Sequence, residues 1–385
     1  MIKVITIIGA RPQIIKAAAL SRCINTLYKK EIHEIIVHTG QHYDANMSDV
    51  FFKEMGIPKP KYNLGVGSFT HGKQTAFMTD RIEEILLKEK PDMVILYGDT
   101  NSTLAGSIAA SKIHIPVAHI EAGLRSFNKS MPEEINRIVC DHTATLLFSP
   151  TQKGIDNLKK EGFNLKNKPP YNMDRPGVFH CGDVMLDNAL YFSKEAEKKS
   201  SLLKSLHSKN SPFLLATIHR DSNTNDPLRL NSIFSAFHHI STKYAIRIII
   251  PLHPRTLKIL PKNLKPALYK AISKNKNIGI IPPVSFFDMI QLEKNASLII
   301  TDSGGVQKEA YFYKKPCIIV RSETEWVEIV KAKAARICDA DENKIIQATS
   351  YFFEHPLKKL PPIFGNGKAA EFICKKMVEH ISKTL

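Results

Sequence analysis

The chain has 385 residues, of which 43% are hydrophobic and 24% are charged, the composition of an ordinary globular protein. This length is enough for two domains with separate cores, and the composition excludes a disordered, collagen-like or disulfide-rich chain. The formal charge of +17 suits nucleic acid, an anionic membrane surface or an anionic small substrate. Because the lysines are dispersed and no binding motif accompanies them, we expect a solvated basic surface, with no nucleic-acid partner and no membrane partner.

The cellular compartment is indicated by the N-terminus and the cysteines. Met1–Gly9 is apolar but too short for a signal peptide, so we expect a buried strand there. No apolar run is long enough to span a bilayer. The six cysteines are widely spaced, which argues against a zinc ribbon, a redox pair or a disulfide framework. We therefore expect a cytoplasmic protein.

The first half of the chain alternates apolar runs with amphipathic stretches. The expected strands are residues 3–8, 34–38, 93–97, 116–120 and 146–149. Helical patterns lie between and after them, at residues 14–28, 70–88, 104–113, 134–143 and 151–161. This alternation predicts a parallel sheet covered by helices on both faces.

The second half repeats this architecture after a segment at 164–177 that is rich in Pro, Asn and Lys, which we interpret as a linker. Strands are expected at 213–218, 246–252, 278–281, 298–301 and 316–320, and an amphipathic helix at 367–385. We predict an α/β fold of two doubly wound domains with a cleft between them. The N-terminal domain covers 1–170 and the C-terminal domain covers 178–366.

Polar clusters follow seven of the expected strands, where ligands of doubly wound sheets bind. In the first half they begin at Gly9, His38, Gly98 and His119, and in the second half at His219, His253 and Thr301. Seven such clusters are hard to explain as capped turns alone. They indicate a site built from both halves.

The cluster Asp302-Ser303-Gly304-Gly305 opens an expected helix. Small residues there expose backbone N–H groups at the positive helix end, which suits a diphosphate. Glu309 lies further along the same helix, where it could accept hydrogen bonds from ribose hydroxyls. Ordinary helix capping is the alternative. The loop matches neither a P-loop nor a GxGxxG fingerprint.

The titratable candidates are Asp99, Glu121, Glu133 and His219. Asp99 and Glu121 end successive strands, and a carboxylate among others in a dry cleft has a raised pKa that suits proton transfer. Glu133 and Arg137 lie one helical turn apart, so they could form an ion pair or reach a ligand together. No histidine or cysteine pattern predicts a metal site, and no motif predicts a cofactor.

Taken together, these motifs resemble the non-hydrolysing UDP-N-acetylglucosamine 2-epimerase family over nearly the whole chain. The segments that carry the resemblance are 9–12, 98–100, 119–125, 132–137, 219–220 and 301–305. Within the family, residues 9–13, 38–44, 124–128 and 324–328 are similar to a subgroup that includes UDP-2,3-diacetamido-2,3-dideoxyglucuronate 2-epimerases, which serve surface-polysaccharide pathways.

The resemblance implies a GT-B-like fold with a C-terminal helix that returns to the first domain, and a homodimer. It implies inversion at C2 of a UDP-2-acetamido sugar, with UDP-N-acetylglucosamine as our first candidate substrate. In the family, the C2 proton is removed, UDP leaves to give a 2-acetamidoglucal, and UDP adds back, without metal or nicotinamide.

Site residues follow from the same motifs. The resemblance implies catalytic roles for Asp99, Glu121, Glu133, Arg137 and His219. It implies UDP binding by the following residues: Arg11, Lys16, Arg220, His253, Ser303, Gly304 and Glu309. Some members are activated by a second substrate molecule, for which Gln41 and His42 are the candidates here, although Asp44 stands where the family has another glutamine.

Three other readings remain open from the residues alone. A UDP-sugar glycosyltransferase could use the same fold. A catalytically silent nucleotide-sugar binding protein would need no carboxylate set. Nucleic-acid binding is suggested only by the net charge.

Overall fold

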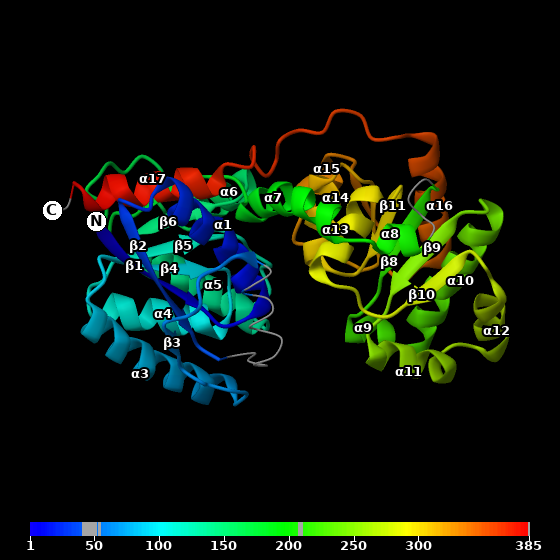
Figure 1. The fold of residues 1–385 in the computed structure, drawn as a ribbon, viewed down its shortest axis with the longest axis horizontal. Coiled ribbons are helices and arrows are strands. Elements are labelled where there is room, and N and C mark those ends of the chain that lie inside the picture. The colour runs from blue at the N-terminus through cyan, green and yellow to red at the C-terminus, as the bar shows by residue number, and fades with distance from the viewer. Residues whose placement is uncertain (41–51, 53–54, 207–210, 384–385) are drawn as a thin grey trace. The chain divides into compact units, whose positions relative to one another are not determined.

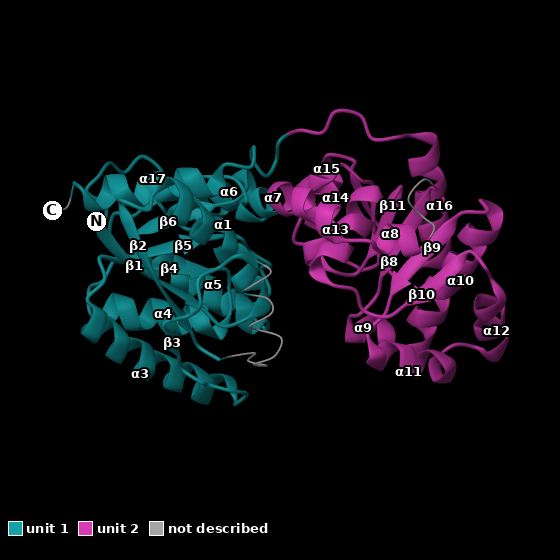
Figure 2. Cartoon of the chain, viewed as in Figure 1, with its two compact units in different colours: residues 1–188, 362–385 teal, residues 189–361 magenta. Residues whose placement is uncertain are grey.

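The computed structural model describes residues 1–40, 52, 55–206 and 211–383. The chain forms two compact units, Met1–Asn188 with Pro362–Leu385 and Ala189–Pro361 (Figure 2). Each unit is an α/β domain with one parallel sheet (Figure 1). The described helices include none with the length and apolar character that a bilayer crossing requires.

The first unit contains a seven-stranded sheet in the order β3-β2-β1-β4-β5-β6-β7. Its strands are β1 (Ile2–Ile8), β2 (Ile32–His38), β3 (Tyr62–Asn63), β4 (Met93–Tyr97), β5 (Val117–Ile120), β6 (Leu146–Ser149) and β7 (Gly177–His180). The helices are α1 (Arg11–Leu27), α3 (His71–Glu89), α4 (Asn101–Lys112), α5 (Pro132–Thr143), α6 (Gln152–Lys160) and α17 (Ala369–Ile381). Every residue of β4 is buried, as expected for a parallel strand covered on both faces.

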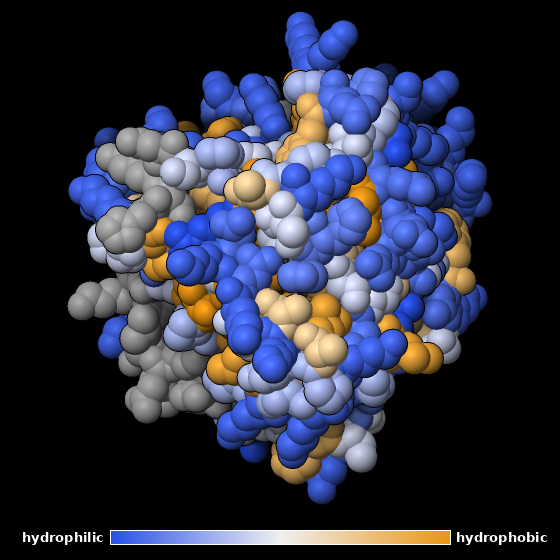
Figure 3. All heavy atoms as spheres, turned by 90° about the vertical axis from the view of Figure 1, so that its right-hand side faces the viewer, coloured by the Kyte–Doolittle hydropathy of each residue, from blue (hydrophilic) through white to orange (hydrophobic). Residues whose placement is uncertain are grey.

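The second unit contains a six-stranded sheet in the order β10-β9-β8-β11-β12-β13. Its strands are β8 (Phe213–Thr217), β9 (Arg247–Pro251), β10 (Ile278–Ile281), β11 (Leu298–Thr301), β12 (Cys317–Ile319) and β13 (Ala335–Ile337). The helices are α8 (Leu202–Ser205), α9 (Asp221–Thr224), α10 (Pro227–Lys243), α11 (Pro254–Asn263), α12 (Pro266–Lys274), α13 (Phe286–Asn295), α14 (Gly304–Phe312), α15 (Val327–Lys331) and α16 (Glu342–Glu354). Helix α7 (Val184–Lys199) continues from the first unit into the second. The face in Figure 3 is mostly hydrophilic, with small groups of hydrophobic residues between.

Both sheets have a point where the strand order reverses, and ligands of such sheets bind there, beyond the carboxyl ends of the strands. In the first sheet β1 pairs with β2 on one side and β4 on the other. In the second sheet β8 lies between β9 and β11. The loops after β1 and β4, and those after β8 and β11, are therefore placed together within their own units.

The segment interpreted as a linker lies inside the first unit. Residues 164–177 lead into β7, which pairs with β6 at the edge of the sheet. The change of unit falls at Asn188–Ala189, later than the interval between 170 and 178. The Pro-rich composition was misleading because the strand that follows it, Gly-Val-Phe-His, is too short to give a clear pattern.

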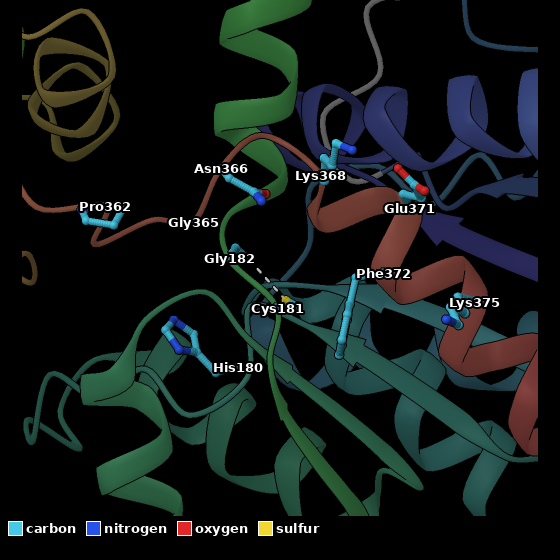
Figure 4. A pocket seen from close by; sticks show the side chains of 10 residues that line it. All are labelled: His180, Cys181, Gly182, Pro362, Gly365, Asn366, Lys368, Glu371, Phe372 and Lys375. Atoms are coloured by element: carbon cyan, nitrogen blue, oxygen red, sulfur yellow. Dashed lines mark hydrogen bonds between the residues drawn. The ribbon is translucent and has the colours of Figure 1, made fainter.

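The C-terminal helix α17 belongs to the first unit, as expected, where it packs against α1. Asp187 caps it by accepting hydrogen bonds from the N–H groups of Ala369 and Ala370 at 3.2 and 2.8 Å. Next to this cap, Figure 4 shows side chains of α17 and residues after β7 around an open pocket of about 540 Å³. At its edge the backbones of Gly182 and Phe364 approach closely, and Asp183 N donates to Phe364 O at 2.9 Å.

Candidate active site

The loop between β1 and α1 is fixed by a buried glutamine. Gln13 Oε1 accepts from the N–H groups of Gly9 and Ala10, at 2.9 and 3.1 Å, and its Nε2 donates to Tyr97 O at the end of β4. These bonds tie together the two loops at the switch point. Arg11 is the first residue of α1 and is exposed at the edge of the sheet where the ligand is expected.

The carboxylates of the first unit cluster at the same edge. Asp99 follows β4, and Glu121 follows the neighbouring strand β5. Lys16 Nζ lies 2.6 Å from Glu121 Oε1. A Cβ built on Gly98 would lie 3.1 Å from Lys16 Nζ and 3.6 Å from Glu121 Oε1. Asp99 and Glu121 thus follow neighbouring strands, as the sequence predicts, and Lys16 of α1 contacts Glu121 there.

Arg137 of α5 ion-pairs with Asp99 and, at 3.0 Å, with Glu134. Its partners among the described residues therefore differ from the Glu133–Arg137 pair considered from the sequence. Glu133 is exposed in the first turn of α5. Glu134, which the sequence analysis did not select, is buried and also accepts from the N–H groups of Ser126 and Phe127. It therefore holds the loop before α5 and orients Arg137.

The pKa of Asp99 is raised, chiefly by burial. The positive charges of Arg137 and Lys16 oppose this rise, whereas the negative charges of Glu121 and Glu133 add to it. A carboxyl group whose pKa is raised in this way is better suited to gain and lose a proton than an exposed carboxylate is.

Glu121 has a left-handed backbone conformation, with φ of 75°, which is costly for a residue with a side chain. Its N–H and that of Ala122 both donate to Phe148 O on β6, at 3.0 and 3.1 Å. Gly123 N donates to Asp141 Oδ2 at 3.1 Å. These bonds compensate the strain, and strain of this kind is concentrated at functional sites.

In the second unit, Asp302 joins the two loops at the switch point. It is fully buried and accepts from the N–H groups of His219 and Arg220, from Asn223 Nδ2, and from His219 Nδ1 at 3.0 Å. Burial acts to raise the pKa of Asp302, but these hydrogen bonds and the nearby His219 outweigh it and lower the pKa. His219 and Arg220 are thereby held beside the loop after β11.

Ser303 is the N-cap of α14, and its Oγ accepts from Val306 N. Gly304 and Gly305 form the first turn, and a Cβ on Gly305 would lie 4.0 Å from Glu309 Oε2. Glu309 therefore turns back over the helix start, as a ribose ligand there would require. His253 caps α11, the helix that follows β9, by accepting from Arg255 N at 3.3 Å.

Other groups at the start of α14 were not selected from the sequence as site residues. Trp326 Nε1 donates to Gly304 O at 3.0 Å, and Arg321 pairs with Glu325 beside Gly304. Glu309 also contacts the buried side chain of Glu293 on α13, and this burial and contact raise the pKa of Glu293. Two carboxyl groups in hydrogen-bonding contact must share a proton.

Gln41 and His42 lie outside the described residues.

Comparison with known proteins identifies the family. Residues 25–378 match the model of the UDP-N-acetylglucosamine 2-epimerase family. A protein of Pseudomonas aeruginosa named UDP-2,3-diacetamido-2,3-dideoxy-D-glucuronate 2-epimerase is 44% identical, with 99% of both chains covered. A UDP-N-acetylglucosamine 2-epimerase of Methanocaldococcus jannaschii is 43% identical, with 97% of this chain and 98% of the relative covered.

Solved structures agree. A crystal structure of Methanocaldococcus jannaschii UDP-GlcNAc 2-epimerase in complex with UDP-GlcNAc and UDP has a TM-score of 0.81 at 41% identity, covering 98% of this chain and 99% of that one. Acinetobacter baumannii MurG, at 13% identity and a TM-score of 0.54, shares the fold only. The two parallel α/β domains are GT-B-like, as expected from the resemblance. The chain belongs to the UDP-N-acetylglucosamine 2-epimerase family, and it is an enzyme of the isomerase class.

Proposed function

We propose that this enzyme inverts C2 of a UDP-2-acetamido sugar, and that UDP-N-acetylglucosamine is its substrate. The observation that carries the proposal is the half-buried group of Asp99, Glu121, Lys16 and Arg137 at the switch point of the first sheet. This group combines a carboxyl group of raised pKa with two positively charged side chains. The carboxyl group can transfer a proton, and the positive charges can stabilise a departing anion.

The proposed reaction has two reversible steps. A carboxylate among Asp99, Glu121 and Glu133 takes the C2 proton, the C1–C2 double bond forms, and the C1–O bond breaks to release UDP. The reverse addition places a proton on the opposite face of C2 while UDP oxygen bonds to C1 again. Atoms balance without an oxidant or a hydride carrier. Arg137 and His219 stabilise the negative charge of the departing diphosphate.

Nucleotide binding is assigned to the second unit, together with two cations of the first. The start of α14, with Ser303 and Gly304, directs backbone N–H groups of its first turn at the diphosphate. Arg220 and His253 lie at neighbouring strand ends, and Glu309 accepts from the ribose hydroxyls. Arg11, the first residue of α1, and Lys16, further along the same helix, add positive charge. Gln41 and His42 remain our candidates for binding an activating second substrate molecule.

A second candidate substrate is UDP-2,3-diacetamido-2,3-dideoxyglucuronate. The similarity to the Pseudomonas aeruginosa relative, 44% over 381 residues, favours it. Both substrates carry the acetamido group at C2 and the diphosphate at C1, so the same proton chemistry serves either. From the family resemblance we also propose a role in surface-polysaccharide synthesis and a cytoplasmic location. We further propose that the enzyme is a homodimer, and light scattering at micromolar concentration would test this oligomeric state.

The test is a product analysis with each substrate supplied alone. We expect NMR to detect the C2 epimer of UDP-N-acetylglucosamine with no acceptor present, and Glu121→Gln to abolish it. Conversion of only the diacetamido uronate would assign the second candidate. Sugar transfer that needs an acceptor, with no epimer formed, would overturn both in favour of a glycosyltransferase.

A further inference from the structure

Behind the two catalytic loops of the first unit lies a fully buried histidine, His119 on β5. Its Nε2 lies 2.8 Å from Gly98 O, and its Nδ1 lies 2.7 Å from Asp141 Oδ1. Gly98 precedes Asp99. Since a carbonyl oxygen can only accept, Nε2 must carry a proton.

The other nitrogen faces an ionised carboxylate. Asp141 Oδ2 accepts from Gly123 N at 3.1 Å and pairs with Arg125 at 2.7 Å. These donors favour the charged form of Asp141 and lower its pKa. Nδ1 must then be a donor as well, which leaves the imidazole doubly protonated.

The titratable and charged groups that face His119 are Asp141 and Cys140 on α5, with Arg125 behind Asp141. Burial acts to lower the pKa of His119, but Cys140 and Asp141 outweigh it and raise the pKa well above the ordinary value. Arg125 is balanced in turn by Glu161, so the buried charges form alternating pairs. Such an arrangement offsets the cost of burying each charge.

We propose that His119 is a positioning residue that stays an imidazolium and, with Asp141, fixes the loops that carry Asp99 and Glu121. One nitrogen holds the carbonyl before Asp99, and Asp141 holds the amide of Gly123, two residues after the strained Glu121. His119 is itself buried, so it acts through these loops and not on the sugar. This role rests on the proposed epimerisation.

The ionisation is tested on the wild-type protein, apart from any activity. In histidine-labelled protein, ¹⁵N NMR should show both His119 nitrogens still protonated at pH values above the ordinary histidine pKa of about 6.5. The loss of one signal in His119→Gln assigns it. A neutral ring at pH 7 would overturn the proposal.

The positioning role is tested by kinetics. We expect His119→Ala to lower kcat about a hundredfold, because small misplacements of catalytic groups have effects of this size, while UDP affinity stays unchanged. His119→Gln, whose amide can donate to Gly98 O, should recover part of the loss, and the exposed control His33→Asn should match wild type. Equal loss in Ala and Gln variants, together with weakened UDP binding, would contradict positioning. A wild-type enzyme without epimerase activity would instead refute the proposed function and leave the NMR result standing.

Discussion

Lys16 Nζ lies 2.6 Å from Glu121 Oε1, and each of these side chains is only 12% exposed. Lys16 lies in α1 and Glu121 directly follows β5, so the pair joins this helix to the loop after β5. The contact gives Lys16 a second role beside the proposed binding of UDP. It supplies the positive charge that keeps a buried carboxylate next to Asp99 tolerable.

Replacing Lys16 with Met should therefore impair catalysis as well as binding. We expect kcat to fall about a hundredfold, the usual scale of an acid–base contribution, because Glu121 loses its counter-ion. Steady-state kinetics would measure this, with the exposed Lys112→Met as the matched control. A change in KM alone would mean that Lys16 only binds nucleotide.

Replacing Arg137 with Gln should move the pH profile. Arg137 lowers the raised pKa of Asp99, so removing its charge favours the protonated carboxyl group and raises that pKa further. We expect the limb of the kcat/KM profile that reports Asp99 to move to higher pH. Arg137→Lys keeps the charge and should leave the limb nearly in place. An unchanged limb in Arg137→Gln would show that another group sets it.

Asp302→Ala should destabilise the second unit. It leaves the part-buried amides of His219 and Arg220 without their acceptor, which costs up to about 1–3 kcal/mol per group. Because the folded pKa of Asp302 is lowered, its stabilisation is present above the ordinary carboxyl pKa and is lost as pH falls through the folded value. Denaturant unfolding should show that the difference in free energy of unfolding between variant and wild type becomes smaller toward acid pH. A gap independent of pH would contradict this assignment.

Gly182→Ala should weaken the docking of the C-terminal segment. Gly182 has φ of 84°, and a Cβ there would lie 2.9 Å from Phe364 O. Backbone strain and the steric clash act together. We therefore expect the free energy of unfolding to fall by more than the roughly 1–3 kcal/mol that backbone strain alone costs. Gly162→Ala is the control, because its φ of 93° is similar but nothing lies within 4 Å of the added methyl group. Equal melting temperatures for the two variants would exclude the clash.

The sequence alone was sufficient to predict the two parallel sheets and the polar clusters at the ends of their strands. Apolar runs such as Met93–Tyr97 identify buried parallel strands, and polar residues directly after them meet wherever those strands are neighbours. Short edge strands such as Tyr62–Asn63 escaped notice because two residues carry no period. The ion pair of Arg137 with Asp99 could not be predicted either. Helical spacing indicates Glu133 as a partner, whereas the contact with Asp99 depends on how α5 packs in the folded unit.

The most direct test of the account is solvent exchange at C2. The enzyme would be incubated with UDP-N-acetylglucosamine in deuterated buffer, and with the diacetamido uronate in a parallel tube, while NMR follows the C2 proton. Proton removal by a carboxylate of the first unit predicts that deuterium enters C2 of the converted sugar and that Glu121→Gln stops it. Epimer that keeps all of its original hydrogen at C2 would contradict the proposed mechanism.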